Sequence, residues 1–365
     1  MGHQLFFELI QVAIGNRESL SKTPTLEEWM SLYSMASKQA LAGVCAAALE
    51  RLKAHGQRPP EPLLWKWIGT VAEIQQRNER LNKQCVKLQK ILLRDGFRSS
   101  VLKGQGVALY YPNGLSSYRQ PGDIDIWVDA PRDVVIDYAM KLCPNRVFDA
   151  KHIHCNVFRD TEIEMHWVPS VSPVPSINKK LERFYNEQRE RQMTHNLELC
   201  RDGAQLVTPD VRFNAVYLLN HILGHFLYEG IGLRQMMDYY FILLKLGNGQ
   251  RSVLQAWKEF GLDKFAASVM YVMQIVFGMS EEEVLYKPDS KGGRVVLQEI
   301  MEGGNFGFYS QENQVRGEPW WHHAKRRFTR RLRLLQYDPK GLLWQPIYRV
   351  RLGLWRRRVL NKYGL

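Results

Sequence analysis

The sequence predicts an α+β protein in which a small sheet with an α/β-type core is flanked by helical regions on both sides. Three observations lead to this prediction. Apolar residues recur at helical spacing through most of residues 5–94, short strand-like stretches follow between residues 97 and 168, and helical spacing returns from residue 209. Helices before and after a group of short strands are typical of one sheet-containing core between helical flanks.

The N-terminal flank is expected to be helical throughout. A proline-rich break at residues 58–62 precedes a long stretch that holds Gly69 but no proline, which favours a single long helix. The expected helices cover residues 5–14, 26–36, 40–52 and 63–94.

The middle of the chain changes to strand-like patterns separated by turns. The order is strand, short helix, strand, helix and then two strands joined by a tight turn, which predicts a compact α/β unit. The expected strands cover residues 97–103, 123–128, 151–159 and 162–168, and the expected helices cover residues 107–111 and 131–141.

The remainder of the chain is expected to be helical at residues 209–245 and 253–277, while residues 181–199 give no clear pattern. A glycine-rich polar region at residues 290–307 is expected to separate the body from the tail. We therefore divide the chain into an N-terminal helical region (1–95), an α/β core (96–200), a C-terminal helical domain (201–300) and a basic, aromatic-rich tail (301–365).

Composition excludes several classes of protein. The 365 residues are 45% hydrophobic and 24% charged, which argues against global disorder, and no apolar run reaches the roughly 18 residues of a spanning helix. The N-terminus lacks the features of a signal peptide, and the five scattered cysteines have no zinc-site spacing. We expect reduced thiols and a cytoplasmic protein, free or peripheral to the membrane.

The net charge of +13 belongs almost entirely to the tail. Residues 322–365 hold thirteen lysines and arginines and a single acid, Asp338. Three interpretations fit: a helix lying on an anionic membrane, a nucleic-acid footprint, or a basic helix folded against the body. The leucines of the tail favour membrane over nucleic acid, because a phosphate-binding surface does not require them.

Asp123 and Asp125 are candidate metal ligands. Side chains on a strand alternate faces, so these two carboxylates are expected on one face with Cα atoms roughly 6.5–7 Å apart. Carboxylate oxygens at that spacing suit Mg²⁺, and two ions suit an in-line displacement at phosphorus. The pattern Asp-x-Asp is also common among solvent-facing aspartates. Whether it marks a metal site therefore depends on the neighbouring motifs.

The surroundings add two elements. Lys103, Gly104 and Gln105 end a predicted strand in a turn whose backbone N–H groups could hold phosphate oxygens. Glu164 lies between apolar residues on another predicted strand, where an unpaired carboxylate would be costly, so it is the natural third carboxylate.

These motifs together resemble the DNA polymerase β-like nucleotidyltransferase superfamily, and most closely its bacterial group of uncharacterised nucleotidyltransferases. The matching pattern is apolar-Lys103-Gly104, then Arg119-x-x-Gly-Asp123-Ile-Asp125, then apolar-Glu164-apolar-His166-Trp. Residues 219–225 and 232–238 are similar to the helical region of that group. The resemblance covers roughly residues 30–310.

The resemblance implies that the sheet of the core is mixed. It also implies transfer of a nucleoside monophosphate from an NTP, ATP being the leading candidate, to an unknown acceptor, with two Mg²⁺ ions. It implies that Asp123, Asp125 and Glu164 are catalytic metal ligands. It also implies nucleotide contacts by Lys103, Gly104, Gln105 and Arg119. The turn departs from the family pattern, because Gln105 replaces Gly or Ser and nineteen positions separate Gly104 from Asp123. A non-catalytic member that binds membrane or nucleic acid through its tail is therefore the alternative.

Other pairs of polar residues are candidates for the lining of an acceptor pocket. His221 and His225 are four apart on a predicted helix, as are Arg234 and Asp238, for which an intrahelical ion pair is the simplest expectation. His166 shares a strand face with Glu164, as His152 does with His154. We assign His166, His221, His225, Arg234 and Asp238 to a possible acceptor pocket.

Overall fold

The computed structural model describes residues 3–112, 114–143, 147–199, 203–309 and 320–363. Its sheet has the order β1-β2-β4-β3, in which β2 and β4 are parallel and both outer pairs are antiparallel. The strands are β1 (Ser99–Val101), β2 (Ile124–Val128), β3 (His152–His154) and β4 (Ile163–His166). The predicted mixed sheet is confirmed, although each strand is shorter than its expected range.

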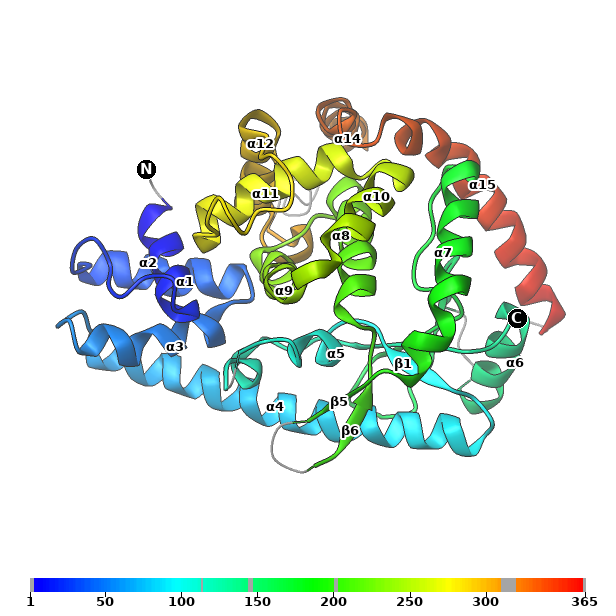
Figure 1. The fold of residues 1–365 in the computed structure, drawn as a ribbon, viewed down its shortest axis with the longest axis horizontal. Helices are drawn as coiled ribbons and strands as arrows, with labels where there is room; N and C mark the ends of the chain where they lie inside the picture. The colour runs from blue at the N-terminus through cyan, green and yellow to red at the C-terminus, as the bar shows by residue number, and fades with distance from the viewer. Residues whose placement is uncertain (1–2, 113, 144–146, 200–202, 310–319, 364–365) are drawn as a thin grey trace.

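The N-terminal helices form as predicted. Thr25 begins the second of them with a capping box, in which its hydroxyl accepts from the Glu28 backbone while the Glu28 carboxylate accepts from the Thr25 backbone. The helices are α1 (Gln4–Ile14), α2 (Leu26–Lys38), α3 (Ala42–Lys53) and α4 (Glu61–Arg94). The long α4 runs beneath much of the molecule in Figure 1.

Helices and a small hairpin surround the sheet. Residues 181–199, which gave no clear sequence pattern, fall in the end of one helix and the first strand of the hairpin. These elements are α5 (Gln105–Ala108), η1 (Leu115–Tyr118), α6 (Arg132–Leu142), α7 (Pro175–Thr194), β5 (Asn196–Glu198) and β6 (Gln205–Val207).

The C-terminal helices are α8 (Val211–Tyr228), α9 (Leu233–Lys245), α10 (Gln250–Phe260), α11 (Asp263–Phe277) and α12 (Ser290–Gly303), with short turns η2 (Gly247–Gly249) and η3 (Asn305–Gly307). The prediction that residues 290–307 form a polar separator is wrong, because α12 packs against α11. Gly292 and Gly293 allow this packing, since an added Cβ would meet Ser268 and Tyr271 at 2.3–2.4 Å. Glycine therefore serves close helix packing here.

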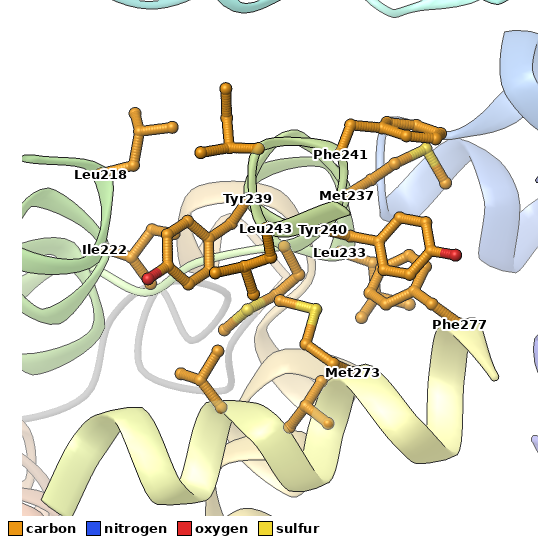
Figure 2. Packing of buried hydrophobic residues seen from close by; sticks show 14 of the residues in the cluster. Leu218, Ile222, Leu233, Met237, Tyr239, Tyr240, Phe241, Leu243, Met273 and Phe277 are labelled. Carbon is orange, nitrogen blue, oxygen red and sulfur yellow. The ribbon is translucent and has the colours of Figure 1, made fainter. Parts of the chain in front are cut away.

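Two hydrophobic cores hold the protein together. The larger combines the N-terminal helices with α8–α12, and Figure 2 shows part of it, where Tyr239, Tyr240 and Phe241 of α9 lie among side chains of α8 and α11. The smaller lies around the sheet and α6. The two ends of α4 contribute to different cores, through Trp67 to the larger and Leu88 to the smaller. The long helix thereby ties the sheet to the helical body.

The tail folds against the body through α14 (Trp320–Leu334) and α15 (Pro339–Lys362). Arg330 of α14 pairs with Glu299 at 2.9 Å and donates to backbone carbonyls of α8. Trp355 of α15 lies edge-on to Phe148 at 5.4 Å. The interpretation of the tail as a basic segment packed on the body is confirmed for these contacts. No helix in the described ranges has the length and apolar character to cross a membrane.

Candidate functional site

Three strands place a row of carboxylates and imidazoles on one face of the sheet. Asp125 of β2 is in register with Glu164 of β4, and Glu164 is in register with His154 of β3. The next row on the same face pairs His166 with His152. We call Asp125, Glu164, His152, His154 and His166 the carboxylate–imidazole face. Asp125 and Glu164 are thirty-nine positions apart in the sequence, and the parallel β2–β4 pair brings them together.

Asp125 is held by a lysine and an imidazole. Lys103, just beyond β1, places its Nζ 2.6 Å from Asp125 Oδ1, and His166 Nε2 lies 3.0 Å from the same oxygen. Burial is the largest influence and acts to raise the pKa of Asp125, but the Lys103 charge together with the hydrogen bond and charge of His166 lowers the net pKa. Asp125 is therefore ionised although it is only 2% exposed.

Glu164 and Asp123 differ in their electrostatic surroundings. Burial acts to raise the pKa of Glu164, but the hydrogen bond from His166 and the charge of Lys103 bring it well below its usual value. Burial raises the pKa of Asp123, and the nearby Asp125 carboxylate raises it further. Asp123 directly precedes β2, so it lies at the rim of the face rather than within it. A cation at this rim would relieve the repulsion between the two aspartates.

Two groups of possible metal ligands occur on this face among the described residues. One consists of Asp125, Glu164 and His166, and the other of His152, His154 and Glu164, each with ligand atoms within 4.8 Å of one another. The expected trio of Asp123, Asp125 and Glu164 is not one of these groups, so any shared ion with Asp123 stays a prediction.

The glycine turn approaches the first aspartate despite the long separation in sequence. Gly104 has φ +53°, and a Cβ added there would lie 3.4 Å from the Asp123 carbonyl oxygen. The side chain of Gln105 points elsewhere, because its Nε2 donates to Asn82 of α4 at 2.6 Å. The turn thus offers the Gly104 backbone to the rim, and a nucleotide contact by the Gln105 side chain would require this hydrogen bond to break.

The guanidinium of Arg119 already binds a carboxylate, whereas a triphosphate contact would need it free. Its guanidinium donates twice to Asp238, at 2.7 Å in both hydrogen bonds, and Tyr111 donates to the same carboxylate at 2.7 Å. Asp238 is thus bound by Arg119, so the expected intrahelical pair with Arg234 is wrong. Burial acts to lower the pKa of Arg119, but Asp238 raises it above its usual value. We call this cluster the Arg119–Asp238 pair.

A cavity of about 540 Å³ opens beside Asp123. Its walls come from α2, the segment before β2, α9 and the segment around η3. Residues that line it include Lys38, Thr70, Gln120, Gly122, Asp123, Arg234, Phe306, Phe308 and Tyr309. The cavity therefore joins the rim of the sheet to both helical regions.

Arg234 is the buried cation of this cavity. One of its terminal nitrogens donates to the Gln120 carbonyl at 3.0 Å, while its Nε is buried and has no hydrogen-bond partner. Its guanidinium lies 5.5 Å from the centre of the Phe306 ring. Burial lowers the pKa of Arg234 to about 10, so the group stays protonated at neutral pH. Arg234 is therefore a charged hydrogen-bond donor whose Nε has no partner in the protein.

Phe306 reaches the cavity from an unusual backbone conformation. Its φ is +53°, in the left-handed region that a residue with a Cβ rarely adopts. The flanking Gly307 packs so tightly that an added Cβ would lie 2.2 Å from the Glu229 carbonyl oxygen. Sequence patterns alone do not select Phe306, Phe308, Tyr309 or Lys38, because their position at the cavity depends on packing between distant segments.

The two histidines of α8, His221 and His225, contact each other, and His225 also contacts Phe306. Their rings are 4.3 Å apart, and His225 Nδ1 is 2.6 Å from Glu229 Oε2. The His225 ring also meets Phe306 at 5.4 Å. Burial, with the charge of Lys103 next in importance, lowers the pKa of His221 well below its usual value. His221 is therefore a neutral imidazole near the carboxylates.

Comparison with known proteins identifies the class. The family described as uncharacterised nucleotidyltransferase matches residues 25–278. The chain belongs to this family, and thus to a family of transferases. No curated protein and no solved structure matches the chain. The matched range contains the carboxylates and Arg234, whereas Phe306 and the tail lie beyond it.

Proposed function

We propose that the protein is a metal-dependent nucleotidyltransferase that moves a nucleoside monophosphate from an NTP to an acceptor. The observation that carries the proposal is the register of Asp125 beside Glu164, with Asp123 at the rim where a cavity opens. In the reaction an acceptor oxygen would attack the α-phosphorus. The bond to the bridging oxygen would break, pyrophosphate would leave, and the acceptor proton would pass to a base.

The donor set at the rim fits a divalent cation that prefers oxygen ligands. The carboxylates of Asp125 and Glu164 raise the pKa of Asp123, and Glu164 acts to raise that of Asp125, through repulsion that a cation would offset. Bound Mg²⁺ would neutralise phosphate charge and polarise the phosphorus centre. The family resemblance favours two such ions. Glu164 is the candidate base for the acceptor proton.

The cavity is the proposed nucleotide site. Its volume of about 540 Å³ falls within the usual range for small-molecule pockets. Arg234, with its unpartnered Nε, would donate to phosphate oxygens, and the Phe306 ring would stack on the base. Lys103 and the Gly104 backbone are further candidates for phosphate contacts. ATP is the first nucleotide to test.

The acceptor is proposed to approach over α8. His221 lies against His225, His225 contacts Phe306, and His166 contacts both Asp125 and Glu164. Arg119 and Asp238 are proposed to support the cavity wall, because each satisfies the other. The chemical class of the acceptor is left to experiment.

The test is pyrophosphate release with each NTP and Mg²⁺, together with binding of fluorescent nucleotides. We expect metal-dependent nucleotide binding in the wild type and its loss in the double variant Asp123→Ala/Asp125→Ala. Equal binding by the two proteins would overturn the proposed site.

A second proposal concerns the tail, and it is favoured by one specific observation. Exposed apolar residues on α15 follow the spacing of a single helix face, namely Leu343, Ile347, Val350 and Leu354. Exposed Arg351, Arg357 and Arg358 lie within one turn of this stripe. An apolar stripe bordered by arginines suits an anionic membrane surface better than nucleic acid.

This membrane proposal is tested by sedimentation with vesicles of phosphatidylserine and phosphatidylcholine, compared with phosphatidylcholine alone. We expect the full chain to pellet only with the anionic vesicles. The variant Ile347→Ser/Val350→Ser should lose this binding while its folding is unchanged, because both side chains are exposed. Equal pelleting of the two proteins would refute the proposal, and binding to RNA instead would favour the nucleic-acid interpretation.

A further inference from the structure

Two imidazoles of the carboxylate–imidazole face, those of His152 and His154, have a geometry that the nucleotidyltransferase proposal does not use. His152 and His154 lie on β3, next to Glu164 of β4. His152 Nδ1 is 3.2 Å from Glu164 Oε2, and His154 Nε2 is 3.9 Å from Glu164 Oε1. Both imidazoles thus direct a ring nitrogen toward the same carboxylate, and the three ligand atoms lie within 4.8 Å of one another.

His154 is oriented by a second carboxylate. Its Nδ1 lies 2.7 Å from Glu162 Oε1, which leaves Nε2 toward Glu164. A hydrogen bond from one ring nitrogen to a carboxylate is how metal-binding histidines are commonly fixed in orientation. Glu162 is largely exposed, so it can hold the ring without entering the site.

His152 supplies an independent observation. The residue is only 7% exposed, and its Nδ1 is buried with no hydrogen-bond partner, because its approach to Glu164 lacks hydrogen-bond geometry. Buried polar atoms seldom lack a partner in folded proteins. A cation between the imidazole nitrogen and the carboxylate oxygen would satisfy both atoms.

The donor set indicates the kind of cation. Mg²⁺ prefers oxygen ligands, whereas imidazole nitrogen suits zinc and other first-row transition metals. Two imidazoles and one carboxylate are also the three protein ligands of some zinc sites that leave a further position open. Neither the family match nor the aspartate motif assigns this site.

We propose that His152, His154 and Glu164 bind a zinc-class transition-metal ion. The site shares Glu164 with the proposed transferase centre, but its formation does not depend on nucleotidyl transfer. We therefore expect the protein to bind Zn²⁺ in the absence of nucleotide.

The experiment uses the full chain after removal of metal with a chelator. Titration with Co²⁺ should give one equivalent of visible d–d absorption, which Zn²⁺ should abolish and a large excess of Mg²⁺ should leave unchanged. Calorimetric titration with Zn²⁺ then gives the affinity.

The variants test individual ligands. His154→Gln and His152→Ala should each weaken Zn²⁺ binding by at least about 10-fold, and Glu162→Gln should weaken it by about 10–100-fold. His55→Gln is the matched control, because His55 is exposed and distant from this face in the sequence. His154 is only partly buried, so its variant keeps the test valid even where His152→Ala does not fold.

Two outcomes would overturn the proposal: no Zn²⁺ or Co²⁺ binding by the wild type, or unchanged binding in His154→Gln. Asp123→Asn separates this proposal from the transferase proposal, since it should keep Zn²⁺ binding and lose nucleotidyl transfer. Zinc binding in a protein that transfers no nucleotide would contradict the transferase proposal alone.

Discussion

Two buried charged clusters in this protein have opposite hydrogen-bonding states. In the Arg119–Asp238 pair, the carboxylate accepts two hydrogen bonds from the guanidinium and one from Tyr111, so both of its oxygens have partners. In the carboxylate–imidazole face, two carboxylates lie side by side and the Nδ1 atoms of His152 and His166 have no partner. The first cluster is complete without a ligand, whereas the second has polar atoms for which a ligand would provide partners. We infer that the first supports the fold and the second serves function.

The largest expected effect is on catalysis. Asp125→Asn should reduce nucleotidyl transfer by at least about 10³-fold, because metal ions contribute several kcal/mol to such reactions and this carboxylate would help to hold them. Pyrophosphate release measures the effect. Asp133→Asn, which changes an exposed aspartate of α6, is the control and should retain full activity.

The second effect is on stability, for which the Arg119–Asp238 pair should matter more than the carboxylate–imidazole face. Asp238→Ala should lower the free energy of unfolding by about 3–5 kcal/mol, because it leaves the Arg119 charge buried and unpaired. Asp125→Asn should cost less, since Glu164 and Asp123 remain near Lys103. Urea denaturation of both variants measures the difference. A larger loss for Asp125→Asn would contradict our assignment of the two clusters.

The third effect is on nucleotide affinity. Arg234→Met should raise the Kd for ATP by about 10–100-fold, because a hydrogen bond to a charged group is worth about 1.5–3 kcal/mol. Fluorescence titration with a labelled nucleotide measures it. Arg251→Met removes an exposed guanidinium from α10 and should leave the Kd unchanged.

The smallest effect is a pH dependence of stability. His221 is neutral in the folded protein because burial lowers its pKa, with Lys103, His225, Lys151 and His166 adding repulsion. In the unfolded chain it binds a proton below a pKa of about 6.5, so unfolding takes up a proton there. This group should therefore lower the free energy of unfolding by up to about 1.4 kcal/mol per pH unit below that value.

Urea denaturation at pH 7.5 and pH 5.5 tests this dependence. His221→Gln should show a smaller loss of stability on acidification than the wild type, and His55→Gln should behave like the wild type. An equal pH dependence in His221→Gln would show that other groups account for it.

The local patterns of the sequence predicted most of the fold. The helices of the N-terminal region and the order of elements in the core follow from periodicity and turn residues that act over a few positions, whereas the mixed sheet was expected from the family resemblance. Residues 290–307 were misjudged because glycine usually marks a loop. In α12 its small size instead allows close packing on α11, which no local pattern reveals.

The sequence by itself determined the candidate carboxylates, since Asp123-Ile124-Asp125 and Glu164 could be selected from residue types and spacing. Only the tertiary structure decided their companions. It placed Lys103 and His152 beside these carboxylates, gave Asp238 to Arg119, and left Arg234 to line the cavity with Phe306. The physical reason is that strand register and helix packing join residues far apart in the chain, and the partner of a buried charge is determined by those contacts.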